Sequence, residues 1–357
     1  MRIRFIIPGD IDTPTGGYRY DRAIIAEWRR EGVDVDLVSL PGSYPDPTDK
    51  ARETALAIIA GCAPADIAVI DGLAGGCSPA LMHRLAQELP VVALVHHPLG
   101  LESGLDEEAG KRLLALEAEG LAAARLIITT SPATRAAVHQ IFQRPLSEIH
   151  AILPGVERRA GSAREETRRF RTRRPLRILS VGSISERKGH DLMIAALGAV
   201  HARDPLLSWH LDLLGAPEFN PPLFERLKAM AKEHGIAGQI TFHGAVDEKT
   251  LERFYDDADV FALASRFEGY GMVYAEAIVR GLPVIATRAG AIPDTVPEVA
   301  GLLVPPDDVP ALAEALFAML SDDALRQGKQ AGAIASAPDF PGWGSSARDF
   351  LSILEAI

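Results

Sequence analysis

The sequence predicts an α/β fold of two doubly wound domains, in which parallel strands alternate with helices. Three observations support this prediction. The chain has 357 residues, enough for two domains, and 47% of them are hydrophobic, which is ample for two cores. Short apolar runs of strand length alternate with patterns of helical period along the chain. In each half, the first strand runs into a glycine-containing segment before a helix, at Gly16–Gly17 and at Gly182–Gly189.

The composition argues against several classes of protein. Lys and Arg number 37 against 48 Asp and Glu, and the resulting net charge of -11 makes the chain a poor partner for nucleic acid or anionic lipid. Cys62 and Cys77 form no CxxC or Cys/His pattern, which argues for a reducing compartment and against a structural zinc. The first apolar run is too short for a signal peptide, and no membrane-length run follows it. We therefore expect a cytoplasmic protein without an integral membrane segment.

The first half opens with a strand–loop–helix–strand unit. Ile3–Ile7 is expected to be a buried strand, and Gly16 and Gly17 are expected to form a turn. The helix after this turn carries Ala23, Ile24 and Trp28 on one face. The loop is not G-x-G-x-x-G, so a dinucleotide cofactor is unsupported.

Two D-x-D triplets in this unit, Asp10–Asp12 and Asp34–Asp36, raise the question of a metal site. Carboxylates are ligands for divalent metals. However, Asp34 and Asp36 fall on the outward face of an alternating strand, and Asp10 and Asp12 lack further ligands. We therefore expect solvated acids and no metal.

His96 and His97 directly follow a predicted strand, at the end where parallel α/β sheets bind ligands. Ala160–Arg174 is polar and basic, and we interpret it as a connection between domains. A nucleic-acid patch is the alternative, but Phe170 is the one aromatic residue within it. The other elements expected in this half are strands at Ile67–Ile70, Val91–Val95, Leu126–Thr130 and Ile149–Leu153, a helix from Glu102 to Arg125, and a helix capped by Ser131.

The second half repeats the alternation of strands and helices. Predicted strands are Leu176–Val181, Trp209–Leu214, Ile240–His243, Val260–Ala264, Val284–Ala286 and Leu302–Val304. Predicted helices are Leu223–His234, Glu248–Asp257, Pro310–Leu320 and an amphipathic C-terminal helix from Trp343.

The stretch from Leu263 to Val284 carries the strongest functional signal. Its pattern predicts a strand, then a turn with Gly269 and Gly271, then a helix. Glu268 lies before the helix and Glu276 lies inside it. Free amides at a helix N-terminus favour phosphate, and a helical rise of ~1.5 Å per residue puts the two carboxylates on the order of 10 Å apart. Carboxylates accept strong hydrogen bonds from hydroxyl pairs. The two acids therefore suit a ribose and a sugar on either side of a diphosphate. A surface turn with two solvated acids is the alternative.

This stretch, SRFEGYGMVYAEAIVRGLPV, resembles the E-x7-E signature of the retaining glycosyltransferases of family four, the glycogen-synthase-like group 1. The resemblance covers nearly the whole chain and is stronger in the second half. It implies the GT-B fold, with two doubly wound Rossmann-like domains facing a cleft. The implied parts are an acceptor-side domain at 1–160, a linker at 161–174, a nucleotide-sugar domain at 175–338 and a helix at 339–357 that crosses back to the first domain.

The resemblance also implies roles for individual residues. Glu268 would orient the donor sugar, Glu276 would bind the ribose, and Lys188 would stabilise the diphosphate. His96 and Gly16 would reach the donor from the first domain when the domains close. The implied catalytic residues are His96, Lys188 and Glu268. The implied donor-binding residues are Gly16, Gly182, Arg187, Lys188, Tyr270, Gly271, Met272, Val273 and Glu276, with Gly17, Tyr18 and His97 as acceptor-side candidates.

One departure from the family pattern concerns the phosphate site. The pattern G-R-[LI]-x-x-x-K-G is matched at Gly182, Lys188 and Gly189, but Ser183 replaces the arginine. One positive charge is therefore missing at that position. Arg187 or Arg266 can substitute for it, and we favour Arg187. An exposed Arg187 without a ligand is the alternative.

The function implied by the resemblance is retaining transfer of a hexose from a UDP- or GDP-sugar to an acceptor hydroxyl, without a metal or other cofactor. The expected partners are the donor and a saccharide or small-molecule acceptor. Peripheral membrane contact is not favoured, because acidic residues offset the arginines of the helix after Gly17. Two alternatives remain open. One is a GT-B epimerase or phosphorolytic enzyme, and the other is a non-catalytic nucleotide-sugar binding protein.

Overall fold

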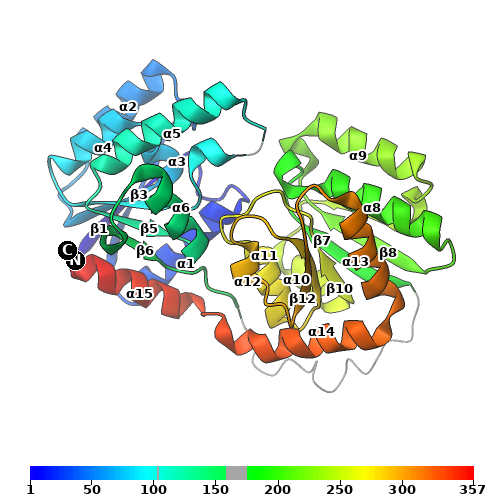
Figure 1. Cartoon of the computed structure of the whole chain (residues 1–357). Coiled ribbons are helices and arrows are strands. Elements are labelled where there is room, and N and C mark those ends of the chain that lie inside the picture. The colour runs from blue at the N-terminus through cyan, green and yellow to red at the C-terminus, as the bar shows by residue number, and fades with distance from the viewer. Residues whose placement is uncertain (103, 158–174) are drawn as a thin grey trace. The chain divides into compact units, whose positions relative to one another are not determined.

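The chain forms two compact units in a computed structural model that describes residues 1–102, 104–157 and 175–357. Unit 1 comprises Met1–Gly155 together with Pro341–Ile357, and unit 2 comprises Val156–Phe340 (Figure 1). The predicted basic linker at 161–174 lies outside the described residues.

Unit 1 is built on a parallel six-stranded sheet with the strand order β2-β1-β3-β4-β5-β6. Its strands are β1 (Arg2–Pro8), β2 (Asp34–Leu40), β3 (Ile67–Asp71), β4 (Val91–Val95), β5 (Leu126–Thr129) and β6 (Ile149–Ala151). Its helices are α1 (Gly16–Arg30), α2 (Asp49–Ala60), α3 (Gly72–Gly75), α4 (Pro79–Ala86), α5 (Glu107–Ala122), α6 (Pro132–Phe142) and α15 (Trp343–Glu355), with 3-10 turns at Leu99–Leu101 and Leu146–Glu148.

The central strands of unit 1 are buried on both faces. Every residue of β3 and β4 is buried. Along β4, Val91, Ala93 and Val95 belong to one hydrophobic cluster, while Val92 and Leu94 belong to another on the opposite side. This arrangement is typical of parallel sheets whose two faces are both covered by helices. It explains why these strands read as continuous apolar runs in the sequence.

The structure corrects the expected glycine turn. Gly16 and Gly17 are the first two residues of α1, and the loop ends one residue earlier, at Thr15. The Thr15 side chain caps the helix by accepting a hydrogen bond from the Tyr18 amide at 3.4 Å. Glycines in the first turn leave room for side chains from neighbouring elements to lie close to the helix.

Two further expectations in unit 1 need correction. The helix expected from Glu102 to Arg125 is shorter, because Asp106 caps α5 by accepting from the Ala109 amide at 2.7 Å. The D-x-D acids of β2 are not both solvated. Asp34 is exposed, but Asp36 forms an ion pair at 3.4 Å with Arg4, whose side chain is buried.

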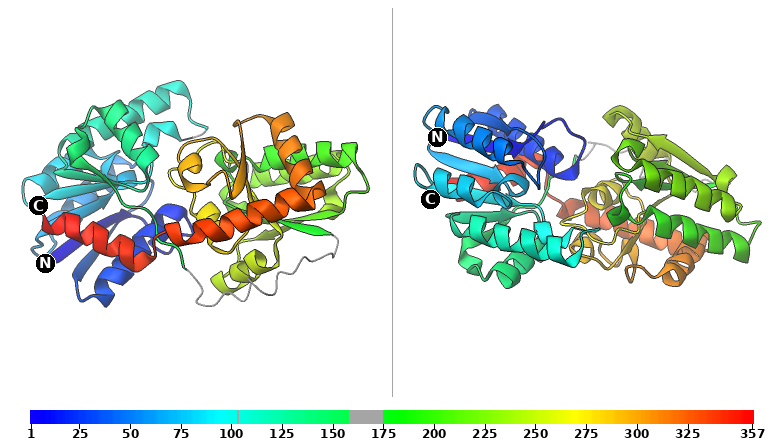
Figure 2. Two further views of the ribbon diagram at one scale, coloured as in Figure 1. Left: turned by 60° about the horizontal axis from the view of Figure 1, so that its bottom comes forward. Right: turned by 90° about the horizontal axis from the view of Figure 1, so that it is seen from above.

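The C-terminal helix α15 belongs to unit 1 and packs against α1, as Figure 2 shows. The Trp28 indole on α1 donates a hydrogen bond of 2.8 Å to the Ala347 carbonyl, and its ring lies 5.0 Å from the Phe350 ring. The last residues of the chain therefore complete the hydrophobic cluster over one face of the first sheet.

Unit 2 has a second parallel six-stranded sheet, with the order β12-β11-β10-β7-β8-β9. Its strands are β7 (Leu176–Val181), β8 (Trp209–Leu214), β9 (Ile240–Gly244), β10 (Val260–Ala262), β11 (Val284–Thr287) and β12 (Gly301–Val304). Its helices are α8 (His190–Arg203), α9 (Pro221–Glu233), α10 (Glu248–Asp257), α11 (Met272–Val279), α12 (Ile292–Thr295), α13 (Val309–Ser321) and α14 (Asp323–Ser336), with 3-10 turns at Glu186–Lys188, Pro217–Phe219, Ala237–Gln239 and Ala337–Asp339.

Each sheet has one point at which the strand order reverses. In unit 1 the reversal lies between β1 and β3, and in unit 2 it lies between β7 and β10. In open α/β sheets, ligands bind at the carboxyl ends of the strands that flank such a point. The two reversals therefore mark where a site is expected in each unit.

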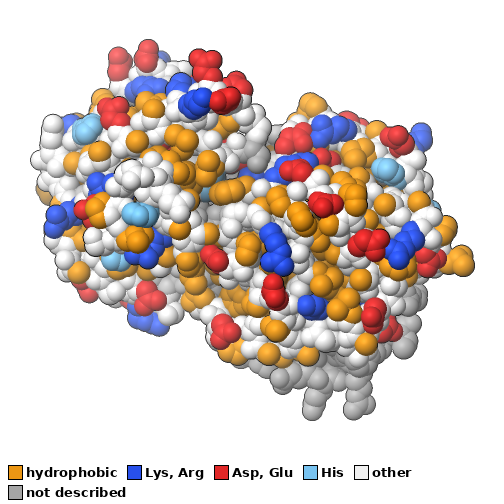
Figure 3. Space-filling view, viewed as in Figure 1, with side chains coloured by type: hydrophobic (Ala, Val, Ile, Leu, Met, Phe, Trp, Pro, Cys, Tyr) orange, Lys and Arg blue, Asp and Glu red, His pale blue; other side chains and the backbone are white. Residues whose placement is uncertain are grey.

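Neither the described helices nor the face drawn in Figure 3 suggests contact with a membrane through a spanning segment or a single-sign charged area. None of the described helices combines the length and apolar character needed to cross a membrane. On the face shown in Figure 3, the acidic and basic side chains of the described residues lie interspersed.

Candidate functional site

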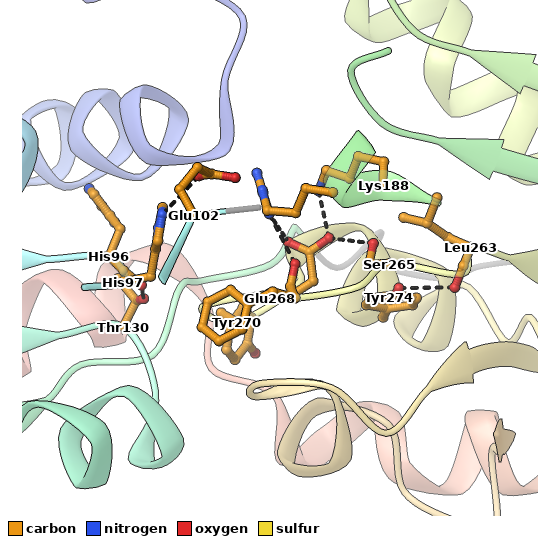
Figure 4. A network of polar contacts seen from close by, with 12 residues as sticks. His96, His97, Glu102, Thr130, Lys188, Leu263, Ser265, Glu268, Tyr270 and Tyr274 are labelled. Carbon is orange, nitrogen blue, oxygen red and sulfur yellow. Dashed lines mark hydrogen bonds and ion pairs between the residues drawn. The ribbon is translucent and has the colours of Figure 1, made fainter. Parts of the chain in front are cut away.

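The reversal point of unit 2 holds a buried carboxylate surrounded by cations. Glu268 follows β10, while Arg187 and Lys188 follow the neighbouring β7. Lys188 Nζ lies 2.6 Å from Glu268 Oε1, as Figure 4 shows. An Arg187 guanidinium nitrogen lies 3.0 Å from Glu268 Oε2. The Ser265 hydroxyl donates to Oε1 at 2.7 Å. The carboxylate that the sequence singled out thus lies beside both predicted phosphate-binding cations.

Glycines let the backbone close tightly around Glu268. Gly290, at φ +55°, lies so near that a Cβ atom there would come within 2.3 Å of the Glu268 carbonyl oxygen. Gly189, at φ +63°, leaves the same kind of space for the Ala264 carbonyl, at 2.0 Å. Both positions combine a left-handed backbone with close contact, so only glycine fits them.

The cations stabilise the charged form of Glu268. Burial alone would raise its pKa, but the charges of Lys188 and Arg187 outweigh burial and lower the pKa to about 2. Two cations and one carboxylate leave this cluster with one excess positive charge. The cluster can therefore stabilise an anionic group that comes within hydrogen-bonding distance.

The helix after Glu268 supplies backbone donors. Gly271 caps α11 with φ +87°, and Met272 and Val273 are its first two residues, so their amides lack an intrahelical acceptor. Tyr270 precedes the cap and is buried, which raises the pKa of its phenol. The predicted donor amides of Tyr270, Gly271, Met272 and Val273 thus fall at this helix start.

Glu276, the second acid of the motif, lies one turn into α11 and is buried. The Tyr255 hydroxyl on α10 donates to Glu276 Oε2 at 2.9 Å and lies 3.3 Å from the Val273 carbonyl oxygen. The Arg280 guanidinium stacks on the Tyr255 ring, 4.7 Å from its centroid. Nothing in the sequence pattern pointed to Tyr255 as a partner of Glu276.

Arg187 and Arg266, the two candidate replacements for the cation missing at Ser183, have different partners in the structure. Arg266 is held by Asp191 at 2.9 Å and by Asp307 at 2.7 Å, whereas Arg187 contacts Glu268. The aliphatic part of Lys188 packs on Gly182, where a Cβ atom would approach to 3.2 Å. Ser183 itself uses its carbonyl to accept a hydrogen bond of 3.2 Å from buried His190. Arg187 is therefore the arginine that the fold places with Lys188.

The reversal point of unit 1 holds the opposite arrangement, one imidazole between two carboxylates. His96 follows β4, Asp71 ends β3, and Asp21 lies on α1 after β1. His96 Nε2 is 3.4 Å from Asp21 Oδ1 and 3.2 Å from Asp71 Oδ2, and Asp21 is fully buried. His96 was predicted as a site residue, but its two acidic partners were not. Their only sequence signal is position, since each follows or ends a strand next to the reversal.

Of the other predicted residues of unit 1, Gly17 and Tyr18 lie next to this cluster. Gly17 lies against the His96 ring, where a Cβ atom would approach Cδ2 to 3.2 Å. The Tyr18 hydroxyl donates to the Pro8 carbonyl. Burial, and to a smaller extent the negative charges of nearby acids, raise the pKa of Tyr18 to about 12. His97 Nε2 lies 3.0 Å from Glu102 Oε2. Gly16 starts α1, two residues before Tyr18.

The same cluster has the spacing of a possible cation site. Among the described residues, the ligand atoms of Asp21, Asp71 and His96 all lie within 4.8 Å of one another, which is close enough to share a cation. The same spacing fits a protonated imidazole between two carboxylates. The predicted D-x-D acids at Asp10 and Asp12 are not part of this group. The expectation of no metal stays a prediction.

A comparison with known families matches residues 175–322 to the model described as glycosyl transferases group 1. Among relatives, a D-inositol 3-phosphate glycosyltransferase of Xylanimonas cellulosilytica is 31% identical over 226 residues, which cover 60% of this chain and 52% of that protein. A GDP-mannose-dependent alpha-(1-6)-phosphatidylinositol monomannoside mannosyltransferase of Mycobacterium tuberculosis is 31% identical, over 50% of this chain and 48% of that protein. The chain thus matches only about half the length of such relatives.

Solved structures match the whole chain. Sucrose-phosphate synthase from Thermosynechococcus elongatus aligns with a TM-score of 0.81 at 21% identity, covering 99% of both chains. Anabaena HepE, solved in complex with UDP-glucose, aligns with a TM-score of 0.75 at 16% identity, over 99% of this chain and 100% of that one.

Two parallel sheets of reversed strand order and these structural matches define a protein of the GT-B fold, which confirms the predicted fold class. The family model described as glycosyl transferases group 1 matches residues 175–322, within unit 2, and the relatives named above are glycosyltransferases.

Proposed function

We propose that the chain is a retaining glycosyltransferase that moves a hexose from a nucleotide-diphosphate sugar to an acceptor hydroxyl. The observation that carries this proposal is the cluster of Glu268, Lys188 and Arg187 beside the start of α11, at the reversal point of the second sheet. It combines a cationic site for a diphosphate with two buried carboxylates for hydroxyl groups. The names of the relatives, which are glycosyltransferases, support the same conclusion.

In this proposal, the protein acts by positioning and charge stabilisation. When the glycosidic bond breaks, negative charge grows on the leaving diphosphate, and Lys188, Arg187 and the amides of Met272 and Val273 stabilise it. Glu268 orients the sugar, and Glu276 accepts hydrogen bonds from the ribose. The acceptor attacks from the face that the diphosphate leaves, and a phosphate oxygen takes its proton, so no enzyme nucleophile or metal is required.

The donor is proposed to be a UDP- or GDP-sugar. The structures and relatives include a protein solved with UDP-glucose and an enzyme named as GDP-mannose-dependent, so both nucleotides belong in the first screen. The proposed acceptor is a saccharide or another small hydroxyl compound. Gly17, Tyr18 and His97 remain the acceptor-side candidates.

The first experiment is calorimetric binding of UDP, GDP, ADP and their common sugars to the wild type and to Glu276→Ala. One nucleotide should bind at micromolar level, and the variant should lose about 2 kcal/mol, as expected for a charge-assisted hydrogen-bonded pair. Glu298→Ala is the control, because the Glu298 side chain lies in the same unit and is 80% exposed. Equal binding by Glu276→Ala would remove the ribose assignment.

The second experiment tests the reaction itself. With the donor identified, a panel of saccharides and phosphorylated sugars is tested for transfer, and NMR of the product gives its anomeric configuration. We expect retention, and activity that is unchanged by EDTA. Inversion or a requirement for added metal would contradict the proposed chemistry. Tight donor binding without turnover over a broad acceptor panel would favour a binding protein, and donor turnover without a transfer product would favour an epimerase or phosphorolytic enzyme.

A further inference from the structure

We propose that Asp21 and Asp71 are positioning residues that keep His96 doubly protonated, so that its outer ring nitrogen serves the substrate as a fixed cationic donor and never as a base. The role of the ring toward substrate rests on the proposed glycosyltransferase function. The protonation of the ring does not, and it is tested separately below.

The His96 ring turns one nitrogen toward the two acids. Nε2 points between Asp21 Oδ1 at 3.4 Å and Asp71 Oδ2 at 3.2 Å. Neither contact has the geometry of a directed hydrogen bond, so the ring is held mainly by charge. The other nitrogen, Nδ1, contacts no described hydrogen-bonding group and is not among the buried unpaired atoms. The side chain is 20% exposed, and Nδ1 is the nitrogen left for a ligand.

Asp21 is isolated from other polar groups of the described residues. Its side chain is completely buried, and neither of its oxygens has a hydrogen-bond partner among the described residues. A buried carboxylate without compensation is costly, and an adjacent cation offsets that cost. His96 is the side chain within ion-pair distance. Asp71, by contrast, also caps α3 through Oδ1, which accepts from the Leu73 amide at 2.8 Å. Asp21 therefore has no visible task apart from the ring.

The packing around His96 keeps its ring from rotating away from the acids. Gly17 on α1 packs against one side of the ring, and the Tyr20 ring meets it edge-on at a centroid distance of 5.5 Å. The Thr130 hydroxyl donates to the His96 carbonyl at 3.3 Å and holds the backbone. A fixed ring with Nε2 facing two acids can present only Nδ1 to a substrate.

The charges around the ring act in the same direction. Burial lowers the pKa of His96, but the two carboxylates outweigh burial and raise the pKa to about 10. Burial raises the pKa of Asp21 to about 6, against the opposing effects of His96 and Arg22, so Asp21 is still a carboxylate at pH 7. The other titratable groups near the cluster are Tyr18 and Tyr20, whose pKa values are raised so that both stay neutral. The negative charge of Asp10 contributes to the raised pKa of Tyr18. His97 directly follows His96 in the chain.

A permanently charged imidazole suits one class of substrate group. It donates a charge-assisted hydrogen bond to a hydroxyl oxygen or an anionic oxygen of the sugar substrate, and it has no lone pair with which to accept a proton. The proton of the acceptor hydroxyl must then go elsewhere, as in the phosphate-oxygen scheme above.

The test measures the ring directly, in the whole chain. Side-chain imidazole NMR should show both His96 nitrogens protonated in the wild type from pH 6 to above pH 8. His96→Gln assigns the signals. Asp21→Asn keeps the shape and removes one charge, and it should lower the His96 pKa by about 2 pH units, the size typical of a lost neighbouring charge. Asp46→Asn is the matched control in the same unit, because the Asp46 side chain is 75% exposed.

A second measurement separates protonation from a purely structural role. In Asp21→Asn, kcat/KM should fall tenfold per pH unit above the lowered pKa and recover toward the wild-type value at pH 6. A structural defect would lower activity equally at all pH values and would overturn the proposal. A wild-type His96 that is neutral at pH 7, or one whose titration is unchanged in Asp21→Asn, would overturn it too. So would a stoichiometric metal in the purified protein that Asp21→Asn loses. If the NMR result holds and no transfer is found, the proposed function fails and the protonation of the ring stands.

Discussion

The two units solve the same problem, a charged group buried at a strand-order reversal, with opposite signs. In unit 2 one carboxylate, Glu268, lies between two cations. In unit 1 one imidazole, His96, lies between two carboxylates. Burial opposes charge in both places, and in both places two partners of opposite sign outweigh it. The net charge left over differs, with one excess positive charge in unit 2 and one excess negative charge in unit 1 when His96 is protonated.

Because of this difference in net charge, the cluster of unit 2 is the one suited to bind an anion. The excess positive charge around Glu268 lies beside free amides at the start of α11, so a diphosphate finds both charge and hydrogen-bond donors there. The acids of unit 1 are buried behind His96 and are not offered to a ligand. They act on the ring, and the ring acts on the substrate.

The largest expected effect comes from removing the central carboxylate of unit 2. Glu268→Gln leaves Lys188 and Arg187 facing each other without a counter-ion and removes the acceptor for the sugar. We expect kcat to fall by about 10²–10³-fold, the size typical of losing a group aimed at the reacting centre. Steady-state kinetics measures this, with exposed Glu298→Gln as the control. A kcat near the wild-type value would show that the cluster is only structural.

The cations of the same cluster should affect binding of phosphates. Lys188→Met is expected to weaken UDP or GDP binding by about 10–100-fold, because a charged hydrogen bond is lost. Arg187→Met should have an effect in the same direction if this arginine replaces the cation missing at Ser183. The nucleoside without phosphate should bind both variants and the wild type equally. Lys228→Met is the control, since Lys228 is half-exposed and pairs with Glu225 in unit 2.

The opposite signs predict opposite pH dependence of stability. The pKa of Glu268 is lowered from 4.5 to about 2, so its contribution is present above pH 4.5 and is lost as the pH falls toward 2. The pKa of His96 is raised from 6.5 to about 10, so its contribution is present below pH 6.5 and is lost as the pH rises toward 10.

Urea unfolding of paired variants checks this. The stability gap between the wild type and Glu268→Gln should shrink by on the order of 2 kcal/mol between pH 5 and pH 2.5. The stability gap between the wild type and His96→Gln should shrink by a similar amount between pH 7 and pH 10. The pKa shift of His96 is larger than that of Glu268, but the cost of burying the Asp21 charge offsets part of the stabilisation that it implies. The Glu268→Gln gap should therefore shrink as the pH falls and the His96→Gln gap as the pH rises, and two gaps that both shrink on the same side would contradict the comparison.

The smallest expected effect concerns the support of Glu276. Tyr255→Phe removes the hydroxyl that donates to this carboxylate at 2.9 Å. We expect donor binding to weaken by about threefold to tenfold, the size of one ordinary hydrogen bond, because the hydroxyl acts on the donor only through Glu276. Tyr274→Phe is the matched control, because it removes a buried hydroxyl bonded to the Leu263 carbonyl instead. Equal effects of the two variants would show that Tyr255 acts only through packing.

Much of the architecture could be predicted because each strand of the two sheets is a short apolar run. The predicted and observed bounds of β7 and β8 agree, and those of β4 agree as well. Boundaries were less predictable where a cap decides them. Thr15 and Asp106 each end a loop by accepting one amide hydrogen bond, and the apolar pattern carries no trace of that choice. Helices α2, α4 and α14 were not expected from the sequence at all, and α14 buries only Ala333 and Ser336.

The sequence alone determined the repeated α/β pattern and the segment that carries Glu268, Gly271 and Glu276, because these residues lie within one strand–turn–helix unit and their spacing is local. Only the tertiary structure decided that Asp21 and Asp71 flank His96. Asp21 lies 50 positions before Asp71, and Asp71 lies 25 positions before His96. The three residues meet because β1 and β3 become neighbours when the strand order reverses. The same reversal between β7 and β10 brings Arg187 and Lys188 to Glu268. The spacing of residues within one unit can be counted along the sequence. Contacts between residues on different strands depend on which strands pair in the folded sheet.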